Sequence, residues 1–136
     1  LVDVEMSAPG VVGFIREVKE KVRVVVSHHD FERTADEEAL AELVRRQASL
    51  GADICKLVTT ACGVDDVGTV IRLVRRFRSE GIVAFAMGPI GMVSRVLAPL
   101  AGARFTYASL CSGHETAPGQ LTVVGLRVIY DAIGAY

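Results

Sequence analysis

An alternation of strand-like and helix-like segments runs along the whole chain and limits its fold more than any other feature. Five runs rich in Val and Ile favour strands: Leu1–Met6, Val22–Ser27, Asp53–Thr59, Ile82–Met87 and Ala103–Leu110. Apolar residues recur at helical spacing in Val11–Lys21, Ala35–Leu50, Val64–Glu80, Met92–Ala101 and Leu121–Ile133. This order predicts an α/β fold with a parallel sheet, covered on both faces and joined by right-handed crossovers.

Composition fits one globular domain. The chain has 136 residues, of which 51% are hydrophobic and 23% charged, and no linker or repeat divides it, so we expect a single domain over residues 1–136. The net charge of −1 gives no electrostatic reason to expect binding to nucleic acid or to an anionic membrane. No apolar run approaches the length of a transmembrane helix.

The three cysteines, Cys55, Cys62 and Cys111, are odd in number and lack the C-x-x-C spacing. This pattern argues against a disulfide framework or a zinc site and is typical of a reducing, cytoplasmic compartment. The chain opens on Leu1 inside a strand-like run, with no secretory signal, so we interpret it as a piece of something longer.

Two helices carry further signals. Thr34 followed by Glu37 predicts a capping box before the second helix, and Gly51 is placed to end that helix. Four arginines of the third helix lie largely off its apolar stripe: Arg72, Arg75, Arg76 and Arg78. We interpret them as a solvated face rather than a nucleic-acid patch.

Lys56 is the first candidate for chemistry, because it lies in the middle of an apolar strand. The chain has twelve arginines but only three lysines, and Lys19 and Lys21 lie at a polar helix end. Burial disfavours the charged form of a lysine, and a neutral amine can attack a carbonyl to form a Schiff base. The alternative is a lysine that extends its amine to solvent. The strand alone does not decide between the two.

His28 and His29 end the valine-rich second strand. Catalytic groups gather at the carboxyl ends of parallel strands, and neighbouring strand residues point to opposite faces. We therefore expect one of the two histidines to reach a site as a general acid and base, or else both to be polar residues that end the strand.

Two further segments, each with only a weak signal for a functional site, follow the fourth and fifth predicted strands. Gly88 to Gly91 precede the fourth helix, where Arg95 is placed to bind a carboxylate or phosphate. Thr116 to Gln120 follow the last strand and contain ordinary turn residues.

Together these segments resemble type I 3-dehydroquinate dehydratase. The matching pieces are Asp3–Glu5, Ser27–Phe31, Gly51–Lys56, Ala86–Gly88 with Ser94–Arg95, and Ala117–Gln120. The separation of His29 and Lys56, 27 positions, also fits the family pattern. The resemblance implies a TIM-type (β/α) barrel, of which this chain holds a partial barrel of about five β/α units, the fourth to the eighth strand. It departs from the pattern at Thr116, where Ser is commoner.

The resemblance implies a cytoplasmic lyase of the shikimate pathway, which leads to aromatic amino acids. Lys56 would form an imine with 3-dehydroquinate, and His29 would act as the acid and base. Arg95 would bind the substrate carboxylate, Met87 would pack on its ring, and Gln120 and Thr116 would close over it. No cofactor or metal would be needed. An acidic residue that positions the histidine in this family would lie in the absent strands and would be missing from this chain.

Two alternatives remain. One is another lysine Schiff-base barrel enzyme, such as a class I aldolase. The other is a catalytically incomplete fragment that self-associates through its exposed strand edges, because edge strands invite pairing with a second copy. We expect the isolated chain to be a homo-oligomer and a poor enzyme, because three barrel strands would be absent.

Overall fold

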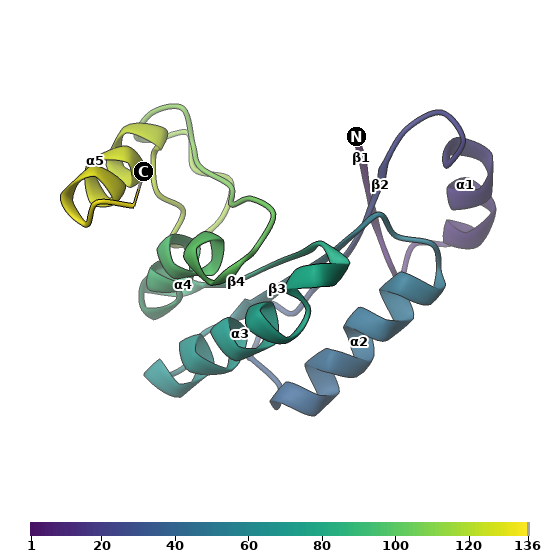
Figure 1. The fold of residues 1–136 in the computed structure, drawn as a ribbon, viewed down its shortest axis with the longest axis horizontal. Coiled ribbons are helices and arrows are strands. Elements are labelled where there is room, and N and C mark those ends of the chain that lie inside the picture. The colour runs from purple at the N-terminus through teal and green to yellow at the C-terminus, as the bar shows by residue number, and fades with distance from the viewer. Residues whose placement is uncertain (136) are drawn as a thin grey trace.

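A four-stranded parallel sheet with helices between its strands forms the body of the protein (Figure 1). The structure is a computed structural model and describes residues 1–135. The strands lie in chain order as β1 (Val2–Glu5), β2 (Val24–His29), β3 (Ile54–Thr60) and β4 (Ile82–Met87). The predicted α/β class is confirmed, and the arrangement is that of a partial (β/α) barrel.

Five α-helices and one short 3₁₀ helix accompany the described strands. They are α1 (Val11–Val18), α2 (Glu37–Ser49), α3 (Val64–Arg76), the 3₁₀ helix η1 (Arg78–Glu80), α4 (Gly88–Ala101) and α5 (Val123–Ala132). α1 and α5 lie at opposite ends of the sheet, and α2 and α3 lie side by side beneath it (Figure 1).

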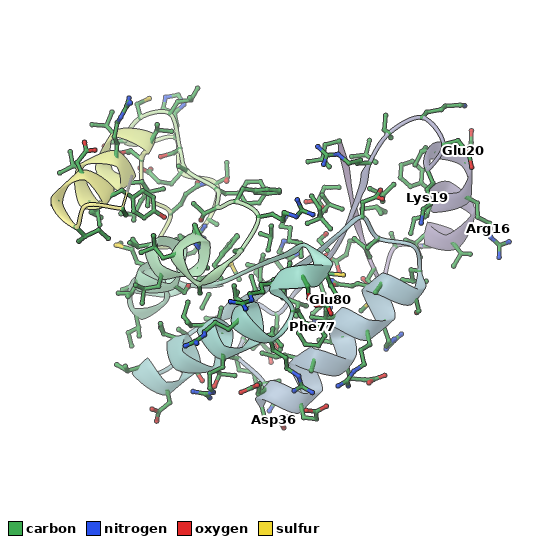
Figure 2. All side chains as sticks on the ribbon, viewed as in Figure 1. Arg16, Lys19, Glu20, Asp36, Phe77 and Glu80 are labelled. Carbon is green, nitrogen blue, oxygen red and sulfur yellow. The ribbon has the colours of Figure 1, made fainter. Side chains whose placement is uncertain are left out.

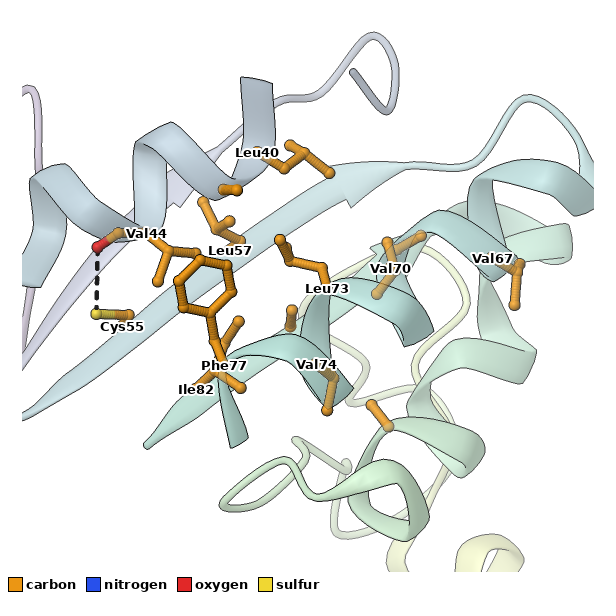
Figure 3. Close-up of a cluster of buried hydrophobic side chains, with 14 of the residues drawn as sticks. Leu40, Val44, Cys55, Leu57, Val67, Val70, Leu73, Val74, Phe77 and Ile82 are labelled. Atoms are coloured by element: carbon orange, nitrogen blue, oxygen red, sulfur yellow. Dashed lines mark hydrogen bonds between the residues drawn. The ribbon is translucent and has the colours of Figure 1, made fainter. Parts of the chain in front are cut away.

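Strand parity separates two faces of the sheet. One face carries Cys55, Leu57, Ile82 and Ala84, which pack against α2 and α3 in the largest apolar cluster (Figure 3). Cys55 is buried there, its thiol donates to the carbonyl of Val44 at 3.6 Å, and burial raises its pKa to about 11. This thiol is therefore packed and protonated at neutral pH.

The opposite face was also predicted to be covered, and side chains rather than helices cover it. It carries a smaller apolar cluster with Val58, Phe85 and Met87, onto which Phe105 and Tyr107 pack from the segment after α4. This face is the inner one of a barrel, where side chains rather than helices fill the space. It is the face that Lys56 shares.

The fifth predicted strand, Ala103–Leu110, does not form. One backbone hydrogen bond, from the Arg104 amide to the Ile82 carbonyl, continues the sheet at 2.9 Å. The segment then leaves β4, and Ser109 makes an isolated bridge with Thr122. A segment with a neighbouring strand on one side only can form few backbone hydrogen bonds. A sequence that favours extended structure is therefore not sufficient to make this segment a strand.

Two helix starts differ from the prediction. Asp36 lies at the start of α2 (Figure 2). It is the cap of this helix in place of Thr34, and its side chain accepts from the Ala39 amide at 2.8 Å. The Thr34 hydroxyl instead donates to the Thr60 carbonyl at 2.9 Å. α4 begins at Gly88, with Pro at its start, so the expected glycine loop is the first turn of the helix.

Candidate active site

Lys56 points from the middle of β3 onto the inner face of the sheet. Its neighbours Cys55 and Leu57 pack under the helices, as the parity of the strand predicted. Its side chain is 11% exposed, and its Nζ donates to Oδ2 of Asp3 at 2.7 Å. The Gln47 amide, fully buried on α2, donates to the Lys56 carbonyl at 2.8 Å and fixes the strand at this residue.

The other two lysines belong to α1 and the turn after it. Lys19 lies at the surface with Arg16 and Glu20, and its amine donates to the Gly51 carbonyl at 2.9 Å (Figure 2). Lys21 is exposed. Lys56 is thus the lysine whose amine is buried on the inner face of the sheet.

His29 ends β2 on the same face as Lys56. Its Nδ1 atom lies 2.7 Å from Oε2 of Glu5, the last residue of β1. An ionised carboxylate only accepts, so Nδ1 carries the hydrogen and Nε2 is the ring nitrogen that can exchange a proton with a ligand. The Phe31 ring stacks on the imidazole with the ring centroids 6.0 Å apart.

Glu5 corrects an expectation from the sequence. We expected the acidic residue that positions the histidine to lie in the absent strands, whereas the structure provides such a partner within this chain. The alternating run Val2 to Glu5 contains the signal, because period two places Asp3 and Glu5 on one face. That face is the one shared with Lys56 and His29.

Arg95 lies in α4 and is 1% exposed. Its guanidinium lies 4.2 Å from the centre of the Phe85 ring. Within residues 1–135, its Nε and Nη2 atoms have no hydrogen-bond partner. Burial lowers the pKa of Arg95 to about 10, so the side chain is charged at neutral pH and in need of an anion.

Thr116 and Gln120 lie in the loop between α4 and α5. The Gln120 Oε1 atom accepts from the Thr116 amide at 2.7 Å and from its hydroxyl at 3.2 Å. The loop is fixed to the start of α4, where the Gly88 amide donates to the Pro118 carbonyl at 3.2 Å.

One cavity of about 290 Å³ brings these groups together. All six residues singled out from the sequence line it: Lys56, His29, Arg95, Met87, Thr116 and Gln120. Sequence reasoning missed the rest of the lining, which is mostly apolar: Phe31, Val58, Phe85, Tyr107 and Ala117. A cavity with an amine, an imidazole and a guanidinium on apolar walls suits an anionic carbonyl compound.

No group of three or more His, Cys, Asp or Glu side chains gathers as metal ligands among the described residues. No described helix is long and apolar enough to cross a membrane.

The fold and the cavity define a class of protein: part of a parallel (β/α) barrel, with its site on the inner face at the carboxyl ends of the strands. Comparison with known proteins then gives the family. The family model described as type I 3-dehydroquinase matches residues 1–136, and the chain belongs to that family.

Named relatives agree. The chain is 37% identical over 133 residues to a 3-dehydroquinate dehydratase of Dehalococcoides mccartyi, covering 98% of this chain and 60% of that protein. It is 43% identical to the enzyme of Thermococcus gammatolerans, over 93% of this chain and 57% of the relative. The chain therefore spans about 60% of the length of these curated relatives.

Solved structures give the same result. The crystal structure of 3-dehydroquinate dehydratase from Geobacillus kaustophilus superposes with a TM-score of 0.89 at 28% identity, over 99% of this chain and 54% of that one. The enzyme from Aquifex aeolicus gives 0.82 at 26% identity, over 98% and 60%. The predicted resemblance and partial barrel are confirmed.

Proposed function

We propose that this chain carries the Schiff-base centre of a 3-dehydroquinate dehydratase, a lyase that converts 3-dehydroquinate to 3-dehydroshikimate in the shikimate pathway of aromatic amino acid biosynthesis. The observation that carries this proposal is the gathering of Lys56, His29 and Arg95 around one cavity in a chain of this family. We further propose that residues 1–136 form one domain and work in the cytoplasm.

The chemistry begins at Lys56. Its neutral amine attacks the substrate ketone, and the carbonyl oxygen leaves as water, so the nitrogen becomes an iminium. The iminium withdraws electrons from the adjacent carbon and makes a proton there acidic. Asp3, 2.7 Å from the amine, is placed to stabilise the positive charge on this nitrogen.

His29 then moves the proton. Its Nε2 removes the proton from the acidified carbon, and the imidazolium returns a proton to the hydroxyl that leaves as water. Glu5 on Nδ1 keeps the ring in the tautomer that this step needs. Hydrolysis of the iminium releases the product and restores the Lys56 amine.

The remaining residues bind the ligand. Arg95, charged and without a hydrogen-bond partner for two nitrogens among the described residues, holds the substrate carboxylate. Met87, 4% exposed, packs against the ring, and Thr116 and Gln120 lie over it from the loop.

Borohydride trapping tests the proposal. The chain is incubated with 3-dehydroquinate and borohydride, and the modified lysine is found by mass spectrometry. We expect an adduct on Lys56, and none in K56R. K19R is the matched control and should trap as the wild type does. An adduct on Lys19 or Lys21 that K56R retains would refute the assignment of Lys56.

An aldol-type Schiff-base reaction is the competing chemistry, and dehydration of 3-dehydroquinate without cleavage of sugar phosphates separates the two.

Self-association is a second candidate behaviour, favoured by β1 and β4 as the two edge strands of the described sheet. We propose that the 136-residue chain forms a homo-oligomer through these edges. Sedimentation as a monomer with normal turnover would overturn this.

A further inference from the structure

Tyr107 lies against the amine of Lys56, and no role was assigned to it from the sequence. The Nζ atom of Lys56 lies 4.8 Å from the centre of the Tyr107 ring, while Asp3 Oδ2 contacts the same nitrogen at 2.7 Å. The amine is therefore held between a carboxylate and an aromatic face. A ring face attracts a cation most strongly where water is largely excluded, as it is around this side chain.

Two further rings fix the orientation of Tyr107. Its ring meets that of Phe85 at an interplanar angle of 61° with 6.0 Å between the centroids, and that of Phe105 at 73° and 5.5 Å. Both are edge-to-face contacts, which hold a ring at a defined angle. Phe105 packs on the inner-face cluster but does not line the cavity, so it supports Tyr107 without contacting Lys56 in this way.

The same pattern holds for the other cation of the cavity. The guanidinium of Arg95 lies 4.2 Å from the centre of the Phe85 ring. Each cation thus lies against one aromatic ring, and those two rings contact each other. The separation of amine and guanidinium is consequently set by a packed aromatic pair.

We propose that Tyr107 is a positioning residue for Lys56, whose ring face holds the nitrogen at the cavity and stabilises positive charge on it. This rests on the proposed Schiff-base role of Lys56. In that step the amine nitrogen bonds to the ketone carbon, one proton is taken up, and the oxygen leaves as water. The resulting iminium keeps its charge beside the ring, as the ammonium did.

The first measurement is independent of any substrate. Reductive methylation with ¹³C-formaldehyde labels the lysines, and K56R assigns the Lys56 signal. Ring current from Tyr107 should shift that signal upfield of Lys19 and Lys21. A Lys56 signal that coincides with theirs overturns the proposal, whether or not Y107L and Y107F fold.

The second measurement compares the rate of borohydride trapping by 3-dehydroquinate in three variants. Y107L should slow trapping on Lys56 about tenfold, the scale of a partly desolvated cation–aromatic contact, and should abolish the upfield shift. Y107F keeps the ring face and should keep both. F77L, which removes a buried ring on the opposite face of the sheet, is the packing control and should trap at close to the wild-type rate.

The outcomes separate clearly. If F77L slows trapping as much as Y107L, or Y107F behaves as Y107L does, the ring face is not the active element and the proposal falls. If the wild type forms no adduct but shows the ring-dependent shift, the proposed function fails while the placement of the amine on Tyr107 stands.

Discussion

The Nδ1 atom of His29 lies 2.7 Å from Oε2 of Glu5, so the last residues of β2 and β1 meet at one end of the sheet. The contact needs neither a loop nor a helix, because both residues are on the same face of adjacent parallel strands. It assigns the hydrogen to Nδ1 and leaves Nε2 as the ring nitrogen for the proposed proton transfer.

Replacing Glu5 with Gln should remove this control. We expect E5Q to lower kcat for dehydration about 10²-fold, the scale at which a misplaced catalytic group fails. Nitrogen NMR should also show the neutral His29 ring losing its preference for hydrogen on Nδ1. The exposed Glu17 on α1 gives the control E17Q, which should leave both unchanged. An unchanged tautomer in E5Q would show that Glu5 does not orient His29.

The two histidines should differ sharply. H29A should lower kcat by about 10²-fold or more, the usual scale for loss of a general acid and base. His28 lies on the other face, does not line the cavity, and is 3.9 Å from Glu5. H28A should therefore retain most of the activity in steady-state assays. Loss of activity in H28A with retention in H29A would reverse the assignment.

Arg95 should make the empty protein less stable. Burial lowers its pKa to about 10, well below the ordinary value for arginine, so the unfolded chain holds this proton more tightly than the folded chain does. By linkage the full cost is present below about pH 10, and the free energy of unfolding rises as the pH increases above that value. The shift corresponds to a destabilisation of the folded protein by about 3 kcal/mol, less the stabilisation that the contact with the Phe85 ring provides.

Urea denaturation at pH 7 measures this. R95M keeps the volume without the charge and should raise the free energy of unfolding by about 1–3 kcal/mol. R46M, at an exposed arginine of α2, should change it by less than about 0.5 kcal/mol. Cyclohexanecarboxylate should stabilise the wild type but not R95M. A less stable R95M would mean that the guanidinium contributes more than its burial costs.

Ser94 connects β4 to α4 and should be structural rather than catalytic. Its buried hydroxyl accepts from the Ala86 amide at 2.7 Å and donates to the Gly91 carbonyl at 2.6 Å. S94A leaves a buried amide unpaired and should cost about 1–3 kcal/mol in urea denaturation. S49A, at an exposed serine of α2, is the control and should cost less than about 0.5 kcal/mol.

Periodicity was sufficient to predict the order of the elements and the direction of Lys56. β4 forms over Ile82–Met87 as expected, and the other described strands differ by one or two residues at each end. The prediction holds for these segments because burial determines where their apolar residues lie, and that pattern can be read directly from the sequence. The Ala103–Leu110 segment fails because a strand also needs neighbours, and a neighbour is not a local property.

Part of the site could be predicted because some of its residues stand out within their own segments of the sequence. Lys56 was found because a lysine in an apolar strand is unusual, and the histidines because they end a valine-rich strand. The family motifs then selected His29 and supplied Arg95 and Gln120. Tyr107 was missed because an aromatic residue in an extended apolar run looks like ordinary core. Its contact with Lys56 joins segments 51 residues apart, which no pattern within either segment reveals.

Gly119 should decide whether the loop reaches the cavity at all. Its φ is 74°, and a Cβ atom there would lie 2.4 Å from the carbonyl oxygen of Gly88, which is backbone and cannot turn away. G119A must therefore move the loop off α4 and carry Thr116 and Gln120 away from the cavity. Gly113 in the same loop is a matched control, since its φ is 84° and its Cβ would meet nothing within 4 Å. Both variants bear the strain of a left-handed residue, about 1 kcal/mol or more, but only G119A adds the clash.

We expect G119A to raise the KM for 3-dehydroquinate and to expose the loop to limited proteolysis well beyond G113A. Equal cleavage and equal KM in the two variants would show that the contact with Gly88 does not hold the loop in place.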